Sequence, residues 1–228
     1  MAKKSRTPPP PRRVQAPKQR RAAPREGRRR QLLLLAGGAV AAAAIAAGAV
    51  AAYVLLGGGS SAEDTLREAG CELEQKPAQG RQHVDELDED FEYNTFPPTS
   101  GPHSGVAAAW DIYSEPVEQF RLVHNLEHGG LVVQYGEDVP ESTVAEISEW
   151  YFDDPNAIIV APLPELEDKV ALTAWTAPDP VPGEDPGPGE GVLATCPGFD
   201  AGAFDAFKDA YGFRGPERFR RDDLQPGT

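Results

Sequence analysis

The sequence predicts a single small α+β domain that lies outside the cytoplasm and follows one N-terminal transmembrane helix. Residues 32–56 form an apolar segment without any charged side chain, which predicts the membrane span. Over the roughly 170 residues that remain, strand-like and helix-like patterns intermix, which is typical of one α+β domain. A sharp change of charge across the apolar segment indicates its orientation.

Residues 1–31 are predicted to be a disordered basic tail in the cytoplasm. The first 30 residues contain twelve Lys or Arg and one acid, Glu26, and so carry a charge of +11. Because they are rich in Pro and lack apolar periodicity, they cannot bury enough surface to offset the entropy lost on ordering. A nucleic-acid-binding arm is another use of such a segment. The apolar stretch directly after it favours a tail that flanks the membrane.

The apolar segment 32–56 is long enough to cross a bilayer. As a helix, its 25 residues would span about 37 Å, against about 30 Å of hydrocarbon. Arg28, Arg29 and Arg30 directly precede the segment, whereas the next basic residue after it is Arg67. Because positive charge stays on the cytoplasmic side, we expect a cytoplasmic N-terminus, a single-pass anchor in the cell membrane and an extracytoplasmic main domain.

A cleaved signal peptide is the alternative interpretation of this segment. Ala49-Val50-Ala51 offers the small side chains of a cleavage site. The apolar core of a signal peptide has only about 7–15 residues, so the length of the segment favours an uncleaved anchor.

The exported part of the chain is strongly acidic. From Gly57 onward there are 10 basic and 35 acidic residues, which gives a net charge of -25. Such a surface repels nucleic acid and anionic lipid, so nucleic acid is not expected as a partner. A metal ion or another protein of the cell envelope fits the charge and the compartment better. Nothing in the pattern indicates an oligomeric state.

The two cysteines lie near opposite ends of the exported part. Outside the cytoplasm a disulfide between Cys71 and Cys196 can persist, and we expect one. In the chain-entropy model, closing a loop of this length stabilises the fold by about 4–5 kcal/mol. Two buried free thiols are the alternative.

The remaining elements follow in order. Residues 57–69 read as a flexible Gly/Ser tether and a short helix capped by Ser61, and residues 70–228 as the α+β domain. Residues 96–104, rich in Pro, predict a fixed loop, and the Pro/Gly-rich residues 177–191 predict a loop insertion without a role in the core. Strands are expected at 71–74, 83–84, 131–135, 157–162 and 170–176, and helices at 140–152 and 199–211.

Three of the four histidines fall within 26 positions and form the candidate metal site. On a helix, His124 and His128 would share a face with about 5–6 Å between their Cβ atoms, whereas on a strand they would lie about 13 Å apart. Chelation therefore requires a helical segment over residues 122–128. His103, in the fixed loop, is the expected third ligand and His83 the fourth. Imidazole suits Zn(II) or Cu(II), and the lack of Met ligands disfavours Cu(I).

Two other interpretations of these residues stay open. The sequence His124-Asn125-Leu126-Glu127-His128 matches the inverted zinc-peptidase motif, in which the Glu acts as general base. The glycine pair that follows leaves no long active-site helix, so we do not predict an enzyme, and Glu127 is only a weak catalytic candidate. Histidines near a glycine turn can also be structural, which would make the domain a metal-free interaction module of the cell envelope.

Two sequence motifs resemble those of a known family. Residues 94–103 read NTFPPTSGPH and residues 123–135 read VHNLEHGGLVVQY. Together they resemble the bacterial and archaeal family of domain of unknown function 3105, over roughly residues 71–219. The resemblance implies a membrane-anchored or exported single domain and singles out the same histidines. It implies no reaction, so the activity and substrate stay unassigned.

Overall fold

The computed structural model describes residues 61–179 and 187–228 of the chain. The predicted basic tail, the predicted membrane span at 32–56 and most of the predicted tether lie outside these residues. Within the described ranges, no helix is long and apolar enough to cross a membrane.

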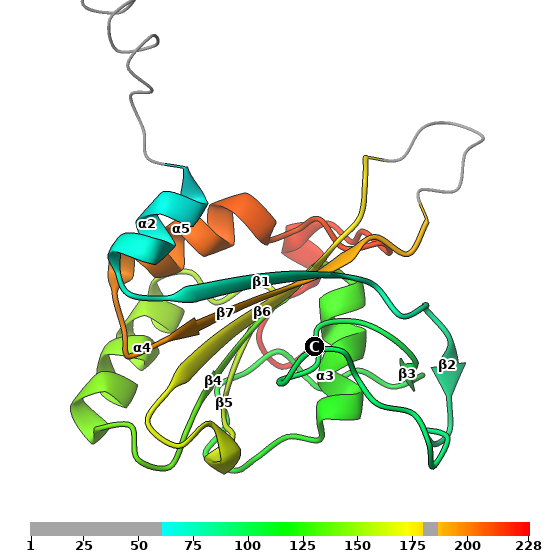
Figure 1. The fold of residues 1–228 in the computed structure, drawn as a ribbon, viewed down its shortest axis with the longest axis horizontal. Coiled ribbons are helices and arrows are strands. Elements are labelled where there is room, and N and C mark those ends of the chain that lie inside the picture. Colours follow the sequence, from blue (N-terminus) through cyan, green and yellow to red (C-terminus); the bar gives the residue numbers. More distant parts are fainter. Residues whose placement is uncertain (1–60, 180–186) are drawn as a thin grey trace, which may run out of the picture. The chain divides into compact units, whose positions relative to one another are not determined.

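A five-stranded mixed sheet forms the centre of the domain (Figure 1). Its strand order is β1-β7-β6-β4-β5, in which β4 and β5 are parallel and all other neighbours are antiparallel. With the helices that cover it, the sheet confirms the predicted α+β class. The strands are β1 (Glu72–Pro77), β4 (Leu131–Tyr135), β5 (Ile158–Pro162), β6 (Val170–Thr176) and β7 (Glu190–Cys196).

Three helices cover one face of the sheet. They are α2 (Ala62–Glu68), α4 (Glu141–Asp153) and α5 (Ala201–Tyr211). As predicted, Ser61 caps α2, since its side chain accepts from the amide of Asp64. Asp200 caps α5 in the same way by accepting from the amide of Ala203. Apolar side chains spaced along these helices pack on the sheet in one cluster that includes Leu66, Ile147, Tyr151, Phe204 and Phe207.

The helix α3 (Gln119–Glu127) lies against the opposite face (Figure 1). Its Leu122, Val123 and Leu126 pack with Val132 of β4 and Trp175 of β6 in a second apolar cluster. Successive residues of β4 alternate between the two clusters, as expected for a pleated strand. The sheet is thus buried on both sides, and α3 contributes three buried polar side chains, His124, Asn125 and Glu127.

The predicted disulfide is confirmed. Cys71 and Cys196 are bonded, with their Cα atoms 4.1 Å apart. Cys71 directly precedes β1 and Cys196 ends β7, two neighbouring strands of the sheet. Both cysteines are buried in the apolar cluster beneath α2, α4 and α5.

The predicted loop insertion at 177–191 is wrong at its C-terminal end. The strand β7 begins at Glu190, and sequence reasoning missed this strand entirely. The residues before it also contact the core. Trp175 Nε1 donates to the carbonyl of Pro188 at 2.6 Å, and the amide of Ala78 donates to the carbonyl of Gly189 at 3.0 Å. The high Pro and Gly content hid these contacts, which depend on the neighbouring strand and not on local propensity.

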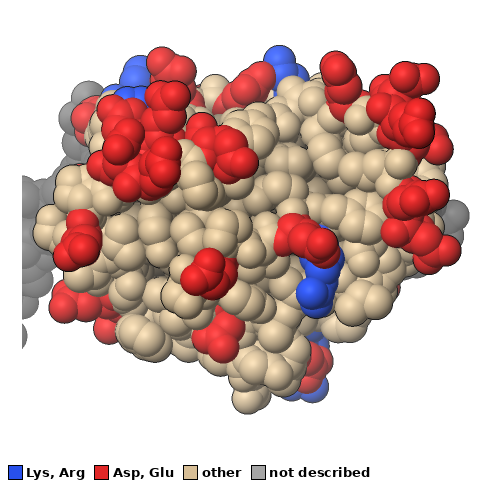
Figure 2. Space-filling view, turned by 90° about the horizontal axis from the view of Figure 1, so that it is seen from below, with Lys and Arg blue, Asp and Glu red and all other residues tan. Residues whose placement is uncertain are grey.

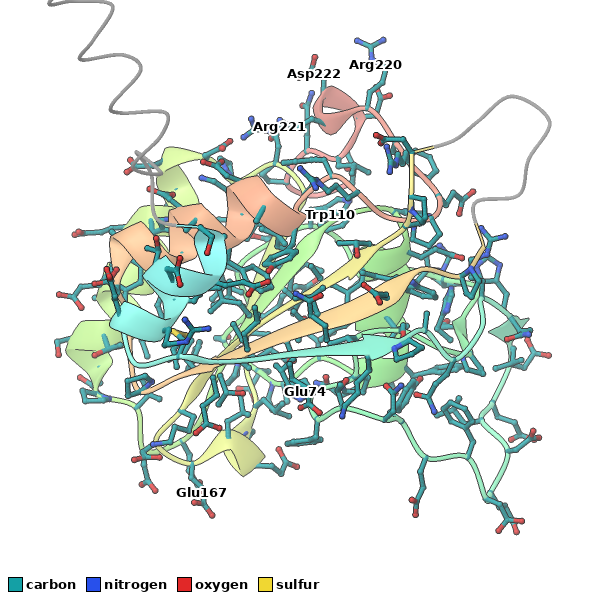
Figure 3. All side chains as sticks on the ribbon, turned by 45° about the horizontal axis from the view of Figure 1, so that its top comes forward. Glu74, Trp110, Glu167, Arg220, Arg221 and Asp222 are labelled. Atoms are coloured by element: carbon teal, nitrogen blue, oxygen red, sulfur yellow. A yellow bond between two sulfur atoms is a disulfide. The ribbon has the colours of Figure 1, made fainter. Side chains whose placement is uncertain are left out.

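The C-terminal segment after α5 lies back across the α3 side of the domain. The amide of Ala157 donates to the carbonyl of Leu224 at 2.8 Å, and the chain ends beside Trp110. Arg220 and Asp222 point outward from this segment (Figure 3). The short helices η1 (Pro164–Leu166) and η2 (Arg221–Asp223) complete the fold. The course of the segment matters because it brings residues 213–219 to the C-terminal end of α3.

Candidate metal centre

All four histidines of the chain lie together beside α3. His83 and His103 are paired in a small parallel sheet of β2 (His83–Val84) and β3 (His103–Ser104). His124 is on α3, and His128 caps its C-terminal end. The rings of His83 and His124 stack with centroids 4.7 Å apart, and those of His103 and His124 meet edge-on at 5.2 Å. The structure therefore places every predicted ligand in one cluster.

The loop before β3 holds His103 in place. Thr95 and Thr99 share a hydrogen bond of 2.9 Å between their hydroxyl groups, and Tyr93 donates to the carbonyl of Pro102 at 2.7 Å. The His103 side chain is completely buried. The rigid loop predicted from the prolines thus has a clear role, which is to aim one imidazole inward.

The rings of His103 and His124 are oriented in the same manner. Each directs Nδ1 at a backbone carbonyl, that of Gly101 at 2.7 Å and that of Ser104 at 2.6 Å, respectively. A carbonyl oxygen only accepts, so both Nδ1 atoms carry hydrogen and donate. Each Nε2 is then left to face the cluster. Metal-binding histidines are held by this kind of hydrogen bond from the other ring nitrogen.

Glu127 is a buried carboxylate in the middle of the cluster. Its Oε2 lies 3.0 Å from Nε2 of His103 and 3.1 Å from Nε2 of His83. Burial by itself raises the pKa of Glu127, but the hydrogen bonds and charge of His103 and His83 outweigh it and hold that pKa below its ordinary value. The carboxylate is therefore ionised at neutral pH and attracts a cation.

The contacts of His103 do not suit a neutral ring on its own. Nδ1 faces a carbonyl and Nε2 faces the ionised Glu127, so both nitrogens meet acceptors. A neutral imidazole has only one N–H. The geometry fits a doubly protonated ring, or a neutral ring whose Nε2 lone pair binds a metal ion together with Glu127. Both arrangements match every acceptor, and the second is the one that the orientation of His124 also suits.

The pKa values of two histidines favour the neutral form that binds metals. Burial lowers the pKa of His124, and the neighbouring His103 and His83 lower it further, against the opposing hydrogen bond to Ser104. Burial also lowers the pKa of His128, and the charge of His124 adds to this effect. A ring that is neutral near pH 7 does not have to lose a proton before it coordinates a metal.

Glycines and one buried amide fix the end of α3. Gly129 has a φ of +87°, a conformation that other residues rarely adopt, and its carbonyl accepts from the amide of Phe213 at 2.7 Å. The amide of Glu217 donates to the carbonyl of Glu127 at 3.0 Å. On the other side, the buried Asn125 side chain exchanges two hydrogen bonds with the backbone of Ala108. These contacts fix the position of the last turn of α3, and with it His124, Glu127 and His128.

Glu217 is a member of the cluster that sequence reasoning missed. Its Oε2 lies 3.3 Å from Nε2 of His128, which in turn lies 3.0 Å from Nε2 of His124. Glu217 stands in a charged segment far from the histidine motifs, and no spacing connects it to them. Only the return of the C-terminal segment across α3 brings it to the site.

The potential ligand atoms form two groups that share His124. His83, His103 and His124 form one group and His124, His128 and Glu217 the other, with ligand atoms within 4.8 Å of one another in each. The predicted set of His103, His124 and His128 is thus divided between the two. His83, expected only as a fourth ligand, belongs to the first group, and its side chain is 48% exposed. A cleft of about 640 Å³ opens beside them, lined in part by Glu127, Gln82 and Pro216.

The part of the chain that matches a known family contains this histidine cluster. A sequence profile of the family described as Protein of unknown function (DUF3105) matches residues 83–215, more than half of the chain. The chain belongs to this family. The match begins at His83 and includes all four histidines and Glu127. No curated protein and no solved structure matches the chain.

Proposed function

We propose that this protein is a membrane-anchored protein whose extracytoplasmic domain binds one divalent metal ion, Zn(II) or Cu(II), through the histidine cluster. One observation carries the proposal. His103 and His124 each donate Nδ1–H to a backbone carbonyl and direct Nε2 toward the same place, where His83 and the ionised Glu127 also point. Such orienting hydrogen bonds are typical of metal-binding histidines.

The chemistry of the donors selects among metals. Imidazole nitrogens and one carboxylate suit Zn(II) and Cu(II), whereas Ca(II) and Mg(II) prefer sites built only from oxygen. Thiolates are excluded as ligands because Cys71 and Cys196 form the disulfide. We therefore expect a site without sulfur that prefers borderline divalent ions.

The proposed location is outside the cytoplasmic membrane, with the span at 32–56 as the anchor. The charge pattern of the sequence supports this orientation. Asp and Glu outnumber Lys and Arg on the face drawn in Figure 2, and the surface suits a domain that collects cations. In intact cells that express the chain, external protease should degrade the domain and leave the N-terminal tail protected. Protection of both parts would contradict the orientation.

Metal binding is tested on the full chain in mild detergent. After treatment with a chelator, titration with Zn(II) or Cu(II) should reach one ion per chain. His103→Gln should weaken binding by about 100-fold or more, since even the loss of an orienting partner costs about 10–100-fold. Glu165→Gln, at the exposed position of η1, is the control and should bind as the native chain does. A native chain that takes up neither ion would contradict the proposal.

A metal-free module with structural histidines is the second candidate, and the close packing of the rings favours it. His103 is fully buried and also meets Trp175 edge-on at 5.9 Å. In that case His103→Gln would lower the stability of the chain to the same extent with and without added metal. Metal-dependent stabilisation that disappears in this variant would exclude the structural interpretation.

A metal-dependent hydrolase is the third candidate, and the cleft beside Glu127 is the observation in its favour. A general base has to face a metal-bound water. Oε2 of Glu127 instead meets two imidazoles at 3.0 and 3.1 Å, as expected for a metal ligand or for an acceptor that orients ligands. Hydrolysis lost in Glu127→Gln while the metal stays bound would establish the base role.

A further inference from the structure

We propose that the histidine cluster offers two alternative positions for the same metal ion, and that the outer one serves for entry and exchange. The inner position is formed by His83, His103 and His124 with Glu127, and the outer position by His124, His128 and Glu217. This inference rests on the proposed metal-binding function. It concerns how an ion reaches the buried ligands.

His124 can bind only one ion at a time. Its Nδ1 donates to the carbonyl of Ser104 at 2.6 Å, so Nε2 is its single available lone pair. Both groups of ligand atoms nevertheless include His124. Two ions bound together would have to share one lone pair, and the groups are therefore alternatives. We expect one ion per chain, not two.

Each position has one ligand that is open to solvent. In the inner position the side chains of His103 and Glu127 are 0% and 6% exposed but that of His83 is 48% exposed, and in the outer position those of His128 and Glu217 are 16% and 51% exposed. His83, Glu127 and Glu217 all line the same cleft. Of the two exposed ligands only Glu217 is a carboxylate, so a cation that enters the cleft is attracted to the outer position first.

The distances allow transfer in short steps. Nε2 of His128 is 3.0 Å from Nε2 of His124 and 3.3 Å from Oε2 of Glu217. Two imidazoles on one tetrahedral zinc ion, with bonds of about 2.0–2.1 Å, have nitrogens roughly 3.4 Å apart. An ion held by these three groups can keep its bond to His124 while Glu217 and His128 are replaced by His103, His83 and Glu127.

The transfer exchanges ligands and involves no oxidation. Bonds from the ion to Glu217 and His128 break as bonds to the inner ligands form. Any proton that the Nε2 of His128 holds leaves to solvent when the ion binds there and returns when the ion moves inward. His124 stays bound throughout, so the ion is never released to solvent between the two positions.

The test measures rates and equilibrium separately on the full chain in detergent. Glu217→Gln and His128→Gln are compared with Glu165→Gln and the native chain. Zn(II) uptake is followed by stopped flow against a chromophoric zinc indicator, and its release by excess chelator. Because exposed charges mainly alter rates, both rates should fall by about tenfold in the outer variants, with the dissociation constant changed by less than about threefold. Thermal unfolding of the metal-free variants checks that each is folded.

Several results would overturn the two-position account. A weaker dissociation constant with unchanged uptake would make Glu217 an ordinary ligand of a single site. Two zinc ions per native chain would make the groups independent sites, and unchanged rates in folded outer variants would remove the exchange role. Each of these leaves metal binding by the histidine cluster standing, and a second zinc ion would revise only its stoichiometry. If the native chain takes up no zinc, both proposals fail.

Discussion

The two faces of the sheet differ in what they bury. Against one face, α2, α4 and α5 contribute apolar side chains to a cluster that also contains the disulfide. Against the other, α3 combines an apolar stripe with buried His124, Asn125 and Glu127. A buried polar group destabilises a fold unless it is paired, so the second face depends more on specific contacts.

This difference suggests that the two faces have separate roles. The apolar face stabilises the domain in a manner that depends mainly on buried area. The α3 face brings a carboxylate and several imidazole rings together. The carbonyls of Gly101 and Ser104 orient two of these rings by accepting from their Nδ1 atoms. Changes on the first face should therefore affect stability and leave metal binding intact, and changes at the histidine cluster on the second face should mainly affect metal binding.

Removal of the disulfide is the largest effect expected. The bond joins residues 125 positions apart, and in the chain-entropy model the loss of a loop of that length lowers the free energy of unfolding by about 4–5 kcal/mol. Urea unfolding of a Cys71→Ser/Cys196→Ser variant measures this loss. Under native conditions the folded fraction should still bind zinc with the native affinity. Weaker zinc binding by that folded fraction would show that the two faces are not separate.

Glu127→Gln is expected to have an intermediate effect, and to act on zinc affinity and not on stability. The amide keeps the shape of the side chain but removes the negative charge that balances the cation beside Nε2 of His103 and His83. We expect zinc affinity to fall by about 10–100-fold, or roughly 1.4–2.7 kcal/mol. Isothermal titration measures the affinity, with Glu165→Gln as the matched control. If the variant bound zinc with the native affinity, Glu127 would neither coordinate the ion nor orient its ligands.

The smallest effect expected is a pH dependence of the metal-free chain. Burial lowers the pKa of His124 and His128 in the folded state, so the unfolded chain takes up protons first as pH falls below the ordinary value of 6.5. The lowered pKa of Glu127 acts in the same direction below 4.5. Stability should therefore decline on acidification.

Urea unfolding in excess chelator, between about pH 8 and pH 5, measures this slope. A His124→Gln/His128→Gln variant should unfold with a flatter dependence over that range. An equally steep slope in the variant would mean that other groups control the acid sensitivity. In that case the histidines of the α3 face would make no pH-dependent contribution to the free energy of unfolding, and this test would not distinguish the two faces.

The same difference explains how much of the fold the sequence could predict. The strands at 131–135 and 170–176 were predicted with the bounds that the structure has, and the helices α4 and α5 within two residues, because apolar periodicity defines them. The strand β7 was missed because a Pro/Gly-rich segment leads into it. Its pairing with β1 and β6 is a tertiary property that local composition does not contain.

Only those features of the site that depend on residues close together in the sequence were predicted. The spacing of His124 and His128 indicated a helical turn, and α3 supplies it. Their division into two groups depends on where β2, β3 and the C-terminal segment lie. His83 therefore proved more central than expected, and Glu217 could not be found. The roles of these residues as ligands stay predictions.

X-ray absorption at the zinc edge, on the full chain loaded with one equivalent of zinc, identifies the ligands of the ion directly. We expect a first shell of nitrogen and oxygen at about 2.0–2.1 Å, without sulfur, and with the scattering pattern of about three imidazoles. The His103→Gln variant should lose one imidazole. A shell of oxygen alone, or a native spectrum that His103→Gln leaves unchanged, would contradict the account.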